Sequence, residues 1–200
     1  PQADVALREA LAMGCDEAYL VSAREFGGSD TYATSGIIAA ALKKIGYDLI
    51  ITGRQAIDGD TAQVGPQIAE KLHLPQVSYV EEVVEAAADH VVVKRQFEDG
   101  YHIIKIKTPC LLTAIAELAT PRYMSVRGIV EAYEKEIKVL GFEDLKDGLE
   151  LDMIGLKGSP TNVYQSFTKE VKGAGTILEG LSADEAVKAI MDKLEAKFII

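Results

Sequence analysis

The feature that most constrains the fold is the alternation of short apolar runs with amphipathic segments early in the chain. "AYLVS" (18–22) and "DLIIT" (48–52) have the length and composition of buried strands. Residues 31–45 carry apolar side chains at helical spacing, and residues 64–72 place one at every fourth position. This succession predicts βαβ units. We therefore expect an α/β fold with a doubly wound, mostly parallel sheet covered by helices on both faces.

Local signals fix the starts of two helices. Pro66 has no backbone N–H and fits best in a first turn, so its helix should begin between Gln63 and Gly65. Ser182 and Glu185 have the spacing of a capping box, which predicts a closing helix over about 182–197.

The pattern changes after Pro75. The β-rich runs at 76–86, 90–98 and 101–116 are separated by the turn-like "AADH" and "EDGY". They predict an antiparallel hairpin excursion that returns to the sheet. From Thr120 the chain lacks a strong periodic core, and we expect irregular structure there.

Composition excludes several functional classes. The chain carries 21 Lys and Arg against 31 Asp and Glu, a formal charge of −10, which argues against nucleic acid and an acidic membrane surface as partners. No apolar run reaches the roughly 20 residues of a membrane span. Cys15 and Cys110 form no CxxC pair and have no nearby basic cluster. We expect two buried thiols in a protein of the reducing cytoplasm.

Two corners of the expected sheet could bind a ligand, because ligands of open α/β sheets lie beyond the carboxyl ends of the strands. They are residues 27–34 and 53–65, which both join a strand to a helix and contain glycine. Each is either a nucleotide site or an ordinary turn and helix cap. Asp58 and Asp60 would repel a phosphate, so we expect them to cap the helix or to bind ribose hydroxyls.

Catalytic groups are scarce in the sequence. His73, His90 and His102 have no metal-ligand spacing, and no nucleophile elbow is present. A bound cofactor would therefore have to carry any redox chemistry. No catalytic residue and no metal site is expected.

Four motifs, in the same order along the chain, resemble motifs of one protein family. "GRQAIDGDTAQVGPQIAEKL" (53–72) closely resembles the adenine-nucleotide-binding signature of the electron transfer flavoprotein β subunit. "KRQFEDGYHIIKIKTPCLLTA" (94–114) is similar to its β-hairpin, and "TPRYMSVRGIV" (120–130) to a later loop. "GSPTNVYQSFT" (158–168) resembles the arm of its bacterial members. The resemblance covers essentially the whole chain.

The resemblance implies a Rossmann-like nucleotide-binding domain over residues 1–145, with an N-terminal part that would precede Pro1. Residues 146–200 would form a C-terminal arm and helix that pack on the family's FAD-carrying α subunit, giving a heterodimer. The chain's own site would hold FAD or, alternatively, AMP. The residues implied to surround the nucleotide's ribose and phosphates are Gly53, Arg54, Gln55, Ala56, Ile57, Asp58, Gly59, Asp60, Thr61, Ala62, Gln63, Val64 and Gly65.

Within the 53–72 motif, the stretch "DGDTAQVGP" is similar to the corresponding stretch of the anaerobic, electron-bifurcating members of the family. This implies a subunit that takes hydride from NADH and passes electrons to the α-subunit flavin and to a low-potential acceptor, ferredoxin or flavodoxin. In such members the corner at 27–34 lies at the NADH site, so Thr31 and Thr34 are expected to bind the NADH diphosphate. The alternatives are a carrier with structural AMP and, third, a stand-alone ATP-using ligase or hydrolase, which lacks a phosphate-binding lysine here.

The resemblance also implies a partner-binding loop. Val126 takes its apolar anchor position, with Tyr123 and Met124 beside it and Arg127 flanking it. An apolar side chain flanked by Arg122 and Arg127 suits a docking site for an acyl-CoA or 2-hydroxy-acid dehydrogenase, and a subunit interface is the alternative. The chain continues with "EAYEKEI" where many members carry a lysine-rich run, so its partner's charge preference should differ.

Overall fold

The computed structural model describes residues 2–168, 173–175 and 177–200. The chain divides into two compact units, one ending at Asn162 and one running from Val163 to Ile200. The first unit therefore extends beyond residue 145. It contains every strand of the described residues.

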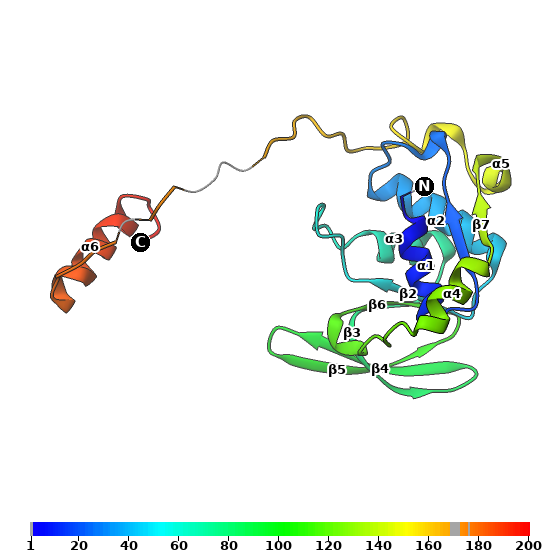
Figure 1. Ribbon diagram of the computed structural model, residues 1–200, viewed down its shortest axis with the longest axis horizontal. Helices are drawn as coiled ribbons and strands as arrows, with labels where there is room; N and C mark the ends of the chain where they lie inside the picture. Colours follow the sequence, from blue (N-terminus) through cyan, green and yellow to red (C-terminus); the bar gives the residue numbers. More distant parts are fainter. Residues whose placement is uncertain (1, 169–172, 176) are drawn as a thin grey trace. The chain divides into compact units, whose positions relative to one another are not determined.

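The predicted strand–helix succession is present in the first unit (Figure 1). Gly46 follows the second helix with φ 84°, a conformation that ends a helix without the steric cost of a side chain. Pro66 lies in the first turn of the third helix, as predicted. The elements are α1 (Asp4–Ala12), β1 (Ala18–Val21), α2 (Thr31–Ile45), β2 (Leu49–Gly53) and α3 (Val64–Leu72).

The predicted β-rich excursion is confirmed. The strands β3 (Gln76–Ala86), β4 (His90–Phe97) and β5 (Gly100–Lys107) form antiparallel pairs in sequence order. Strand β6 (Cys110–Ala114) then lies between β2 and β3 and runs parallel to both. The excursion therefore does return the chain to the parallel part of the sheet.

The prediction of irregular structure from Thr120 is wrong for residues 126–145. This segment forms α4 (Val126–Glu134), β7 (Ile137–Leu140) and α5 (Phe142–Leu145). Ser125 caps α4 through its hydroxyl, which accepts the N–H of Gly128 at 2.9 Å. The single-turn 3-10 helices of the unit are Arg24–Phe26, Ala116–Leu118, Lys146–Gly148 and Leu151–Met153.

The strands form two hydrogen-bonded sheets where one was expected. Strand β7 pairs in parallel with β1, and the other sheet has the order β2-β6-β3-β4-β5. The second sheet is mixed, because its β2-β6-β3 part is parallel and its β3-β4-β5 part is antiparallel. The fold is therefore α/β with parallel strands at its centre and an antiparallel hairpin beside them.

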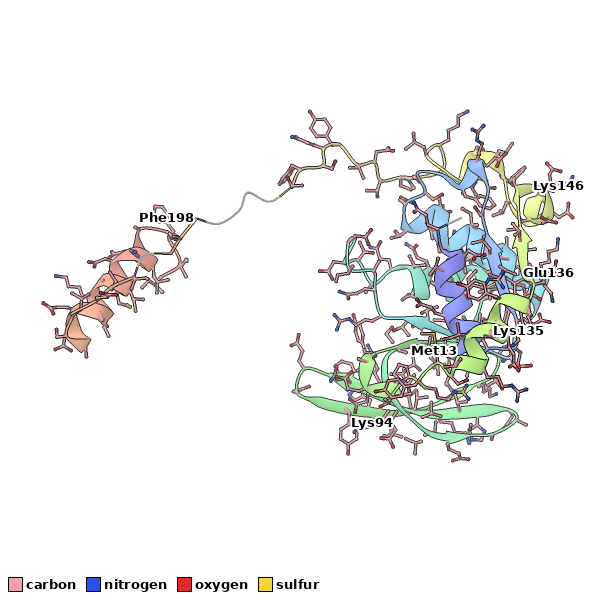
Figure 2. The ribbon with its side chains drawn as sticks, viewed as in Figure 1. Met13, Lys94, Lys135, Glu136, Lys146 and Phe198 are labelled. Atoms are coloured by element: carbon pink, nitrogen blue, oxygen red, sulfur yellow. The ribbon has the colours of Figure 1, made fainter. Side chains whose placement is uncertain are left out.

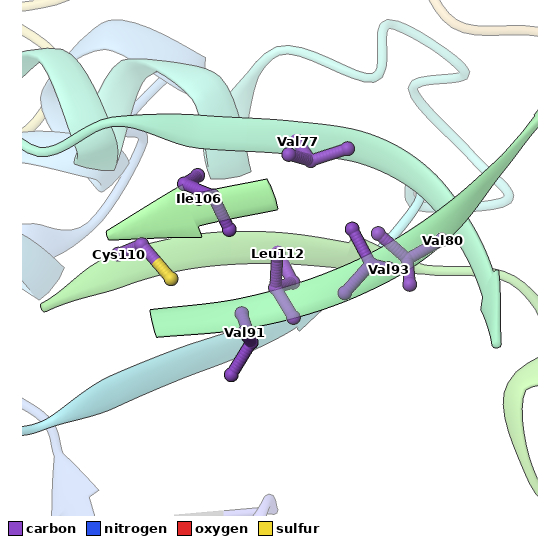
Figure 3. Packing of buried hydrophobic residues seen from close by; sticks show 7 residues of the cluster. All are labelled: Val77, Val80, Val91, Val93, Ile106, Cys110 and Leu112. Carbon is purple, nitrogen blue, oxygen red and sulfur yellow. The ribbon is translucent and has the colours of Figure 1, made fainter. Parts of the chain in front are cut away.

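Helix α2 packs against both sheets. Its Ala39 joins Ile50 and Ile68 in one core under β2 and β6, and its Ala40 and Ala41 join Leu140 in another. On the other side of the β1–β7 sheet, α1 and α4 pack on each other. A further core lies inside the bent mixed sheet (Figure 3), formed by Val77, Val80, Val91, Val93, Ile106, Cys110 and Leu112.

The two cysteines differ in environment. Cys110 is buried, and burial raises the pKa of its thiol. Cys15 is exposed, so the expectation that both thiols are buried is wrong for this residue. Among the helices of the described residues, none combines the length and the apolar character needed to cross a membrane.

The second unit contains α6 (Ala183–Glu195). Its capping box is confirmed, since the Ser182 hydroxyl accepts the N–H of Glu185 and the Glu185 carboxylate accepts the N–H of Ser182. No residue of α6 is buried among the described residues, and Ile190 on its predicted apolar face is 54% exposed. The helix thus presents an apolar face that this unit does not cover.

Candidate functional site

The two predicted corners meet at the N-terminal ends of α2 and α3. The Thr31 hydroxyl, at the start of α2, donates to Gln63 Oε1 at 2.9 Å, just before α3. One turn further along, the Ser35 hydroxyl donates to Gln67 Oε1 at 3.2 Å. The glycine-containing segments that follow β1 and β2 therefore form one continuous surface.

The N-terminus of α3 keeps free donors. Gln63 is its N-cap residue and makes no capping hydrogen bond with its side chain. Within the described part of the chain, the backbone N–H groups of Val64 and Gly65 have no acceptor, and Pro66 has no N–H. Uncapped N–H groups and the positive end of the helix dipole attract an anion such as phosphate.

Gly65 brings α3 into close contact with the sheet. A Cβ atom at this position would lie 2.7 Å from Thr52 Oγ1 on β2 and 2.8 Å from Thr113 Cγ2 on β6. Gly53 and Gly59 differ, because a Cβ atom on either would meet no atom within 4 Å. Gly65 is thus needed for helix–sheet packing, whereas Gly53 and Gly59 leave open space around the loop.

The two aspartates of the loop do not cap α3. Asp58 accepts the N–H of Gly59 at 2.9 Å, and Asp60 accepts the side-chain amide of Gln55. Of the two roles expected for these aspartates, the structure excludes helix capping, and ribose binding stays a prediction. Both carboxylates are exposed, so they are accessible to ribose hydroxyls.

The loop also holds two side chains in a strained backbone conformation. Asp60 and Ala62 have φ 51° and 52°, in the left-handed region that costs a residue with a side chain about 1–2 kcal/mol. Strain of this kind is concentrated at ligand sites, where the surrounding structure maintains it. The two outliers therefore mark this loop as a candidate ligand site.

The N-terminus of α2 is closed by its N-cap residue together with two residues of the 158–168 motif, which no sequence signal linked to this corner. Asp30 caps α2 by accepting the N–H of Ala33 at 3.0 Å, and its second oxygen accepts the N–H of Thr161 at 3.0 Å. The buried Ser159 hydroxyl lies 2.8 Å from the N–H of Asp30, which donates to it. The contacts of Asp30 with Ser159 and Thr161 join positions about 130 residues apart, so no local pattern could have indicated them.

The Asp30 carboxyl is held in its ionised form. Burial opposes ionisation, but the N–H groups of Ala33 and Thr161 together outweigh it and hold the pKa of Asp30 below its usual range. Thr31 and Thr34 beside it are half-buried. An anion at α2 would therefore meet a resident negative charge, whereas α3 offers uncapped donors.

The predicted partner-binding residues are mostly exposed and lie on one short segment. Tyr123 is 99% and Val126 82% exposed, and Met124 lies between them at the start of α4. Arg127 points its guanidinium at Glu131, one turn along the helix, so its charge is partly compensated. The apolar side chains are available to a partner, and their partner-binding role stays a prediction.

Within the described residues, no group of three or more His, Cys, Asp or Glu side chains is arranged to hold a metal ion. His90 lies beside Asp89 and Glu85, and His102 stacks on Phe97 with ring centroids 4.4 Å apart. His90 and His102 therefore each contact side chains that lie near them in the sequence.

The fold is that of an α/β protein in which two strand–helix corners meet at the carboxyl ends of parallel strands. The chain matches the electron transfer flavoprotein domain over residues 1–145. The chain thus belongs to the electron transfer flavoprotein family, as the four motifs predicted.

Several curated relatives match the chain over its whole length. It is 55% identical to the acryloyl-CoA reductase electron transfer subunit gamma of Anaerotignum propionicum, covering 100% of this chain and 76% of that protein. It is 53% identical to the electron transfer flavoprotein subunit beta of Thermoanaerobacterium thermosaccharolyticum, covering 100% and 75%. It is 51% identical to the caffeyl-CoA reductase-Etf complex subunit CarD of Acetobacterium woodii, covering 100% and 76%. The similarity is to the β-subunit side of the family.

Proposed function

We propose that this chain is a flavin-binding, electron-bifurcating β subunit whose nucleotide site is the corner between α2 and α3. The observation that supports this best is the 2.9 Å hydrogen bond from Thr31 to Gln63, beside the uncapped N-terminus of α3. This contact joins the two strand–helix corners into one continuous surface, which would accept a dinucleotide.

The residues at this corner fit an adenine nucleotide. The N–H groups of Val64 and Gly65 would donate to a phosphate, and Arg54 would add positive charge. The exposed carboxylates of Asp58 and Asp60 would accept ribose hydroxyls. FAD in this site supplies the chemistry of hydride acceptance and single-electron release.

NADH would approach at the α2 side of the same surface. Thr31 and Thr34 would donate hydroxyl hydrogen bonds to its diphosphate, and Thr31 would then exchange its present acceptor, Gln63 Oε1, for a phosphate oxygen. The ionised Asp30 carboxylate beside them would oppose this binding, so the hydroxyl contacts would have to outweigh that repulsion. The electrons would leave toward the α-subunit flavin and toward ferredoxin or flavodoxin.

The remaining surfaces fit partner proteins. The apolar face of α6 and the arm before it would pack on the α subunit, since the second unit leaves them exposed. Tyr123, Met124 and Val126 would contact an acyl-CoA or 2-hydroxy-acid dehydrogenase. Val126→Asp should weaken transfer to the dehydrogenase while flavin content stays unchanged; lost flavin together with lost transfer would instead indicate a subunit interface.

Counting the nucleotides released from the purified heterodimer tests the proposed function. Two flavins per heterodimer are expected from flavin absorbance against protein concentration. One flavin and one AMP would contradict the proposal and support a carrier in which AMP is structural. That second function has one observation in its favour, because the resident Asp30 carboxylate makes the α2 side less suited to an anionic diphosphate.

A further inference from the structure

Two side-chain hydrogen bonds join α2 to α3. The outer contact, from the Thr31 hydroxyl to Gln63 Oε1, is exposed at the edge of the candidate site. The inner contact, between the Ser35 hydroxyl and Gln67 Oε1 at 3.2 Å, lies one turn further along both helices. Because a step of four residues on α2 matches a step of four on α3, the helices run in the same direction. The positive ends of both helix dipoles therefore lie at the same edge.

The inner contact has apolar surroundings. Ser35 is 0% exposed, and Ile68, next to Gln67, lies in one aliphatic core with Ala39, one turn after Ser35. Serine forms helices less readily than alanine because its hydroxyl competes for backbone groups, and here the hydroxyl also lies 2.8 Å from the carbonyl oxygen of Tyr32. Neither helix propensity nor burial favours a serine at this position. Its contact with Gln67 is what an alanine would lack.

A buried polar contact of this kind fixes the register of two packed helices. Aliphatic side chains permit small shifts of one helix along the other, whereas a shift here would take the Gln67 amide away from the hydroxyl and set it against aliphatic groups. A buried polar pair adds little net stability, and its best-attested use is to specify one packing arrangement. A hydroxyl both donates and accepts, so either end of the Gln67 amide satisfies Ser35.

The outer contact is not suited to hold the helices together while a ligand is bound. Its exposed partners are open to competition from water, and in the proposed NADH mode Thr31 exchanges Gln63 for a phosphate oxygen. The inner contact is then the remaining side-chain hydrogen bond between α2 and α3 in the described part of the chain. The outer contact can be exchanged, and the inner contact maintains the arrangement.

We propose that Ser35 and Gln67 are positioning residues, which hold the N-terminus of α3 against α2 so that the two corners form one nucleotide surface. This role deepens the proposed function and rests on it for the nucleotide. Val64 and Gly65, whose N–H groups would meet a phosphate, lie within one turn of Gln67 on the same helix. A displacement of α3 therefore moves both donors. Ser35 and Gln67 act through the helix and not by contact with the ligand.

The double variant Ser35→Ala with Gln67→Met tests this role in the purified heterodimer. Replacing both polar partners by apolar groups of similar size is close to neutral for stability, and alanine favours the helix, so the urea midpoint should stay unchanged or rise. AMP is the portion that both candidate cofactors share. Titrated by calorimetry after the exchangeable nucleotide is removed, it should bind about tenfold more weakly, as for the loss of one hydrogen bond to a phosphate.

Two controls separate positioning from a general loss of stability. Ile68→Val removes one methyl group from the core beside Gln67, so it should lower the urea midpoint and leave the AMP dissociation constant unchanged. Lys94→Gln, at a residue labelled in Figure 2, breaks an ion pair of 2.8 Å with Glu81 on the antiparallel strands. It should also leave AMP binding unchanged.

The KM for NADH should rise in the double variant while kcat stays the same, because the displaced corner weakens substrate and transition state equally. A double variant that binds AMP as tightly as the wild type would overturn the positioning role. So would a lowered urea midpoint together with weaker AMP binding, or an Ile68→Val variant that loses AMP affinity to the same extent. Failure of the proposed function appears separately, as AMP in place of a second flavin in the nucleotide count, and the calorimetric comparison still decides the role of the inner contact.

Discussion

Replacing Gly65 by alanine tests whether the proposed nucleotide corner depends on close contact between α3 and the sheet. The new Cβ would lie 2.7 Å from Thr52 Oγ1 and 2.8 Å from Thr113 Cγ2, whereas ordinary contact begins at 3.4 Å. Helix α3 would have to move by about 0.7 Å, the difference between 3.4 and 2.7 Å. Overpacking of a core costs about 1–3 kcal/mol, and alanine's helix propensity returns up to about 1 kcal/mol. The expected net loss in free energy of unfolding is about 1–2 kcal/mol.

Gly36→Ala is the matched control for this substitution. Gly36 lies within α2, where a new Cβ would meet only the end of the flexible Lys71 side chain, at 3.8 Å. This change should stabilise the protein by about 0.5–1 kcal/mol, because it reduces the freedom of the unfolded chain and favours the helix. Urea unfolding with comparison of midpoints and slopes measures both effects. If Gly65→Ala were as stable as the wild type, the close helix–sheet contact would be refuted.

Three further predictions concern the same region. Thr113→Val should cost about 1–3 kcal/mol in urea unfolding because it leaves the N–H of Tyr79 without its acceptor, and an unchanged midpoint would count against this hydrogen bond. Asp30→Ala should cost about 1–2 kcal/mol at pH 7, since two N–H groups lose their acceptor. The folded-state pKa of Asp30 lies below the unfolded value of about 3.9, so the wild type is more stable than Asp30→Ala above pH 4 and loses this difference as the pH falls through the folded pKa. A difference in free energy of unfolding that does not change with pH would contradict the capping role. Thr31→Ala combined with Thr34→Ala should raise the KM for NADH of the purified complex, and unchanged NADH kinetics would rule out that binding mode.

The parts of the fold that the sequence predicts are those with long local signals. Helix α2 has the predicted bounds because fifteen residues carry a consistent apolar spacing and Gly46 stops it. The N-terminus of α3 follows from Pro66, whose missing N–H admits it only to a first turn. Long amphipathic runs contain enough repeats to be recognised, whereas short ones do not.

The segment from 126 to 140 shows why the remainder was missed. Helix α4 contains Gly128, which weakens a helical pattern, yet a Cβ there would lie 2.6 Å from the carbonyl oxygen of Ala12 on α1. Tertiary packing therefore requires the residue that makes the local signal weak. Strand β7 has four residues, too few to show a period, and is stabilised by pairing with β1 far away in sequence.

In the candidate site, too, some features have a local sequence signal and others depend on tertiary contacts. The motif at 53–65 indicated the ligand corner, but the Thr31–Gln63 contact and the closure of α2 by Ser159 and Thr161 depend on the folded chain.

Hydrogen exchange of the purified complex, with its nucleotide bound and after removal, tests the central claim most directly. Amide exchange read by peptide should slow on nucleotide binding in residues 53–65 and at the start of α2, because phosphate would protect the free N–H groups of Val64 and Gly65. The far end of the β4–β5 hairpin, around His90 and Lys107, should not change. Protection elsewhere in the first unit with none at 53–65 would contradict the assignment of the nucleotide to this corner.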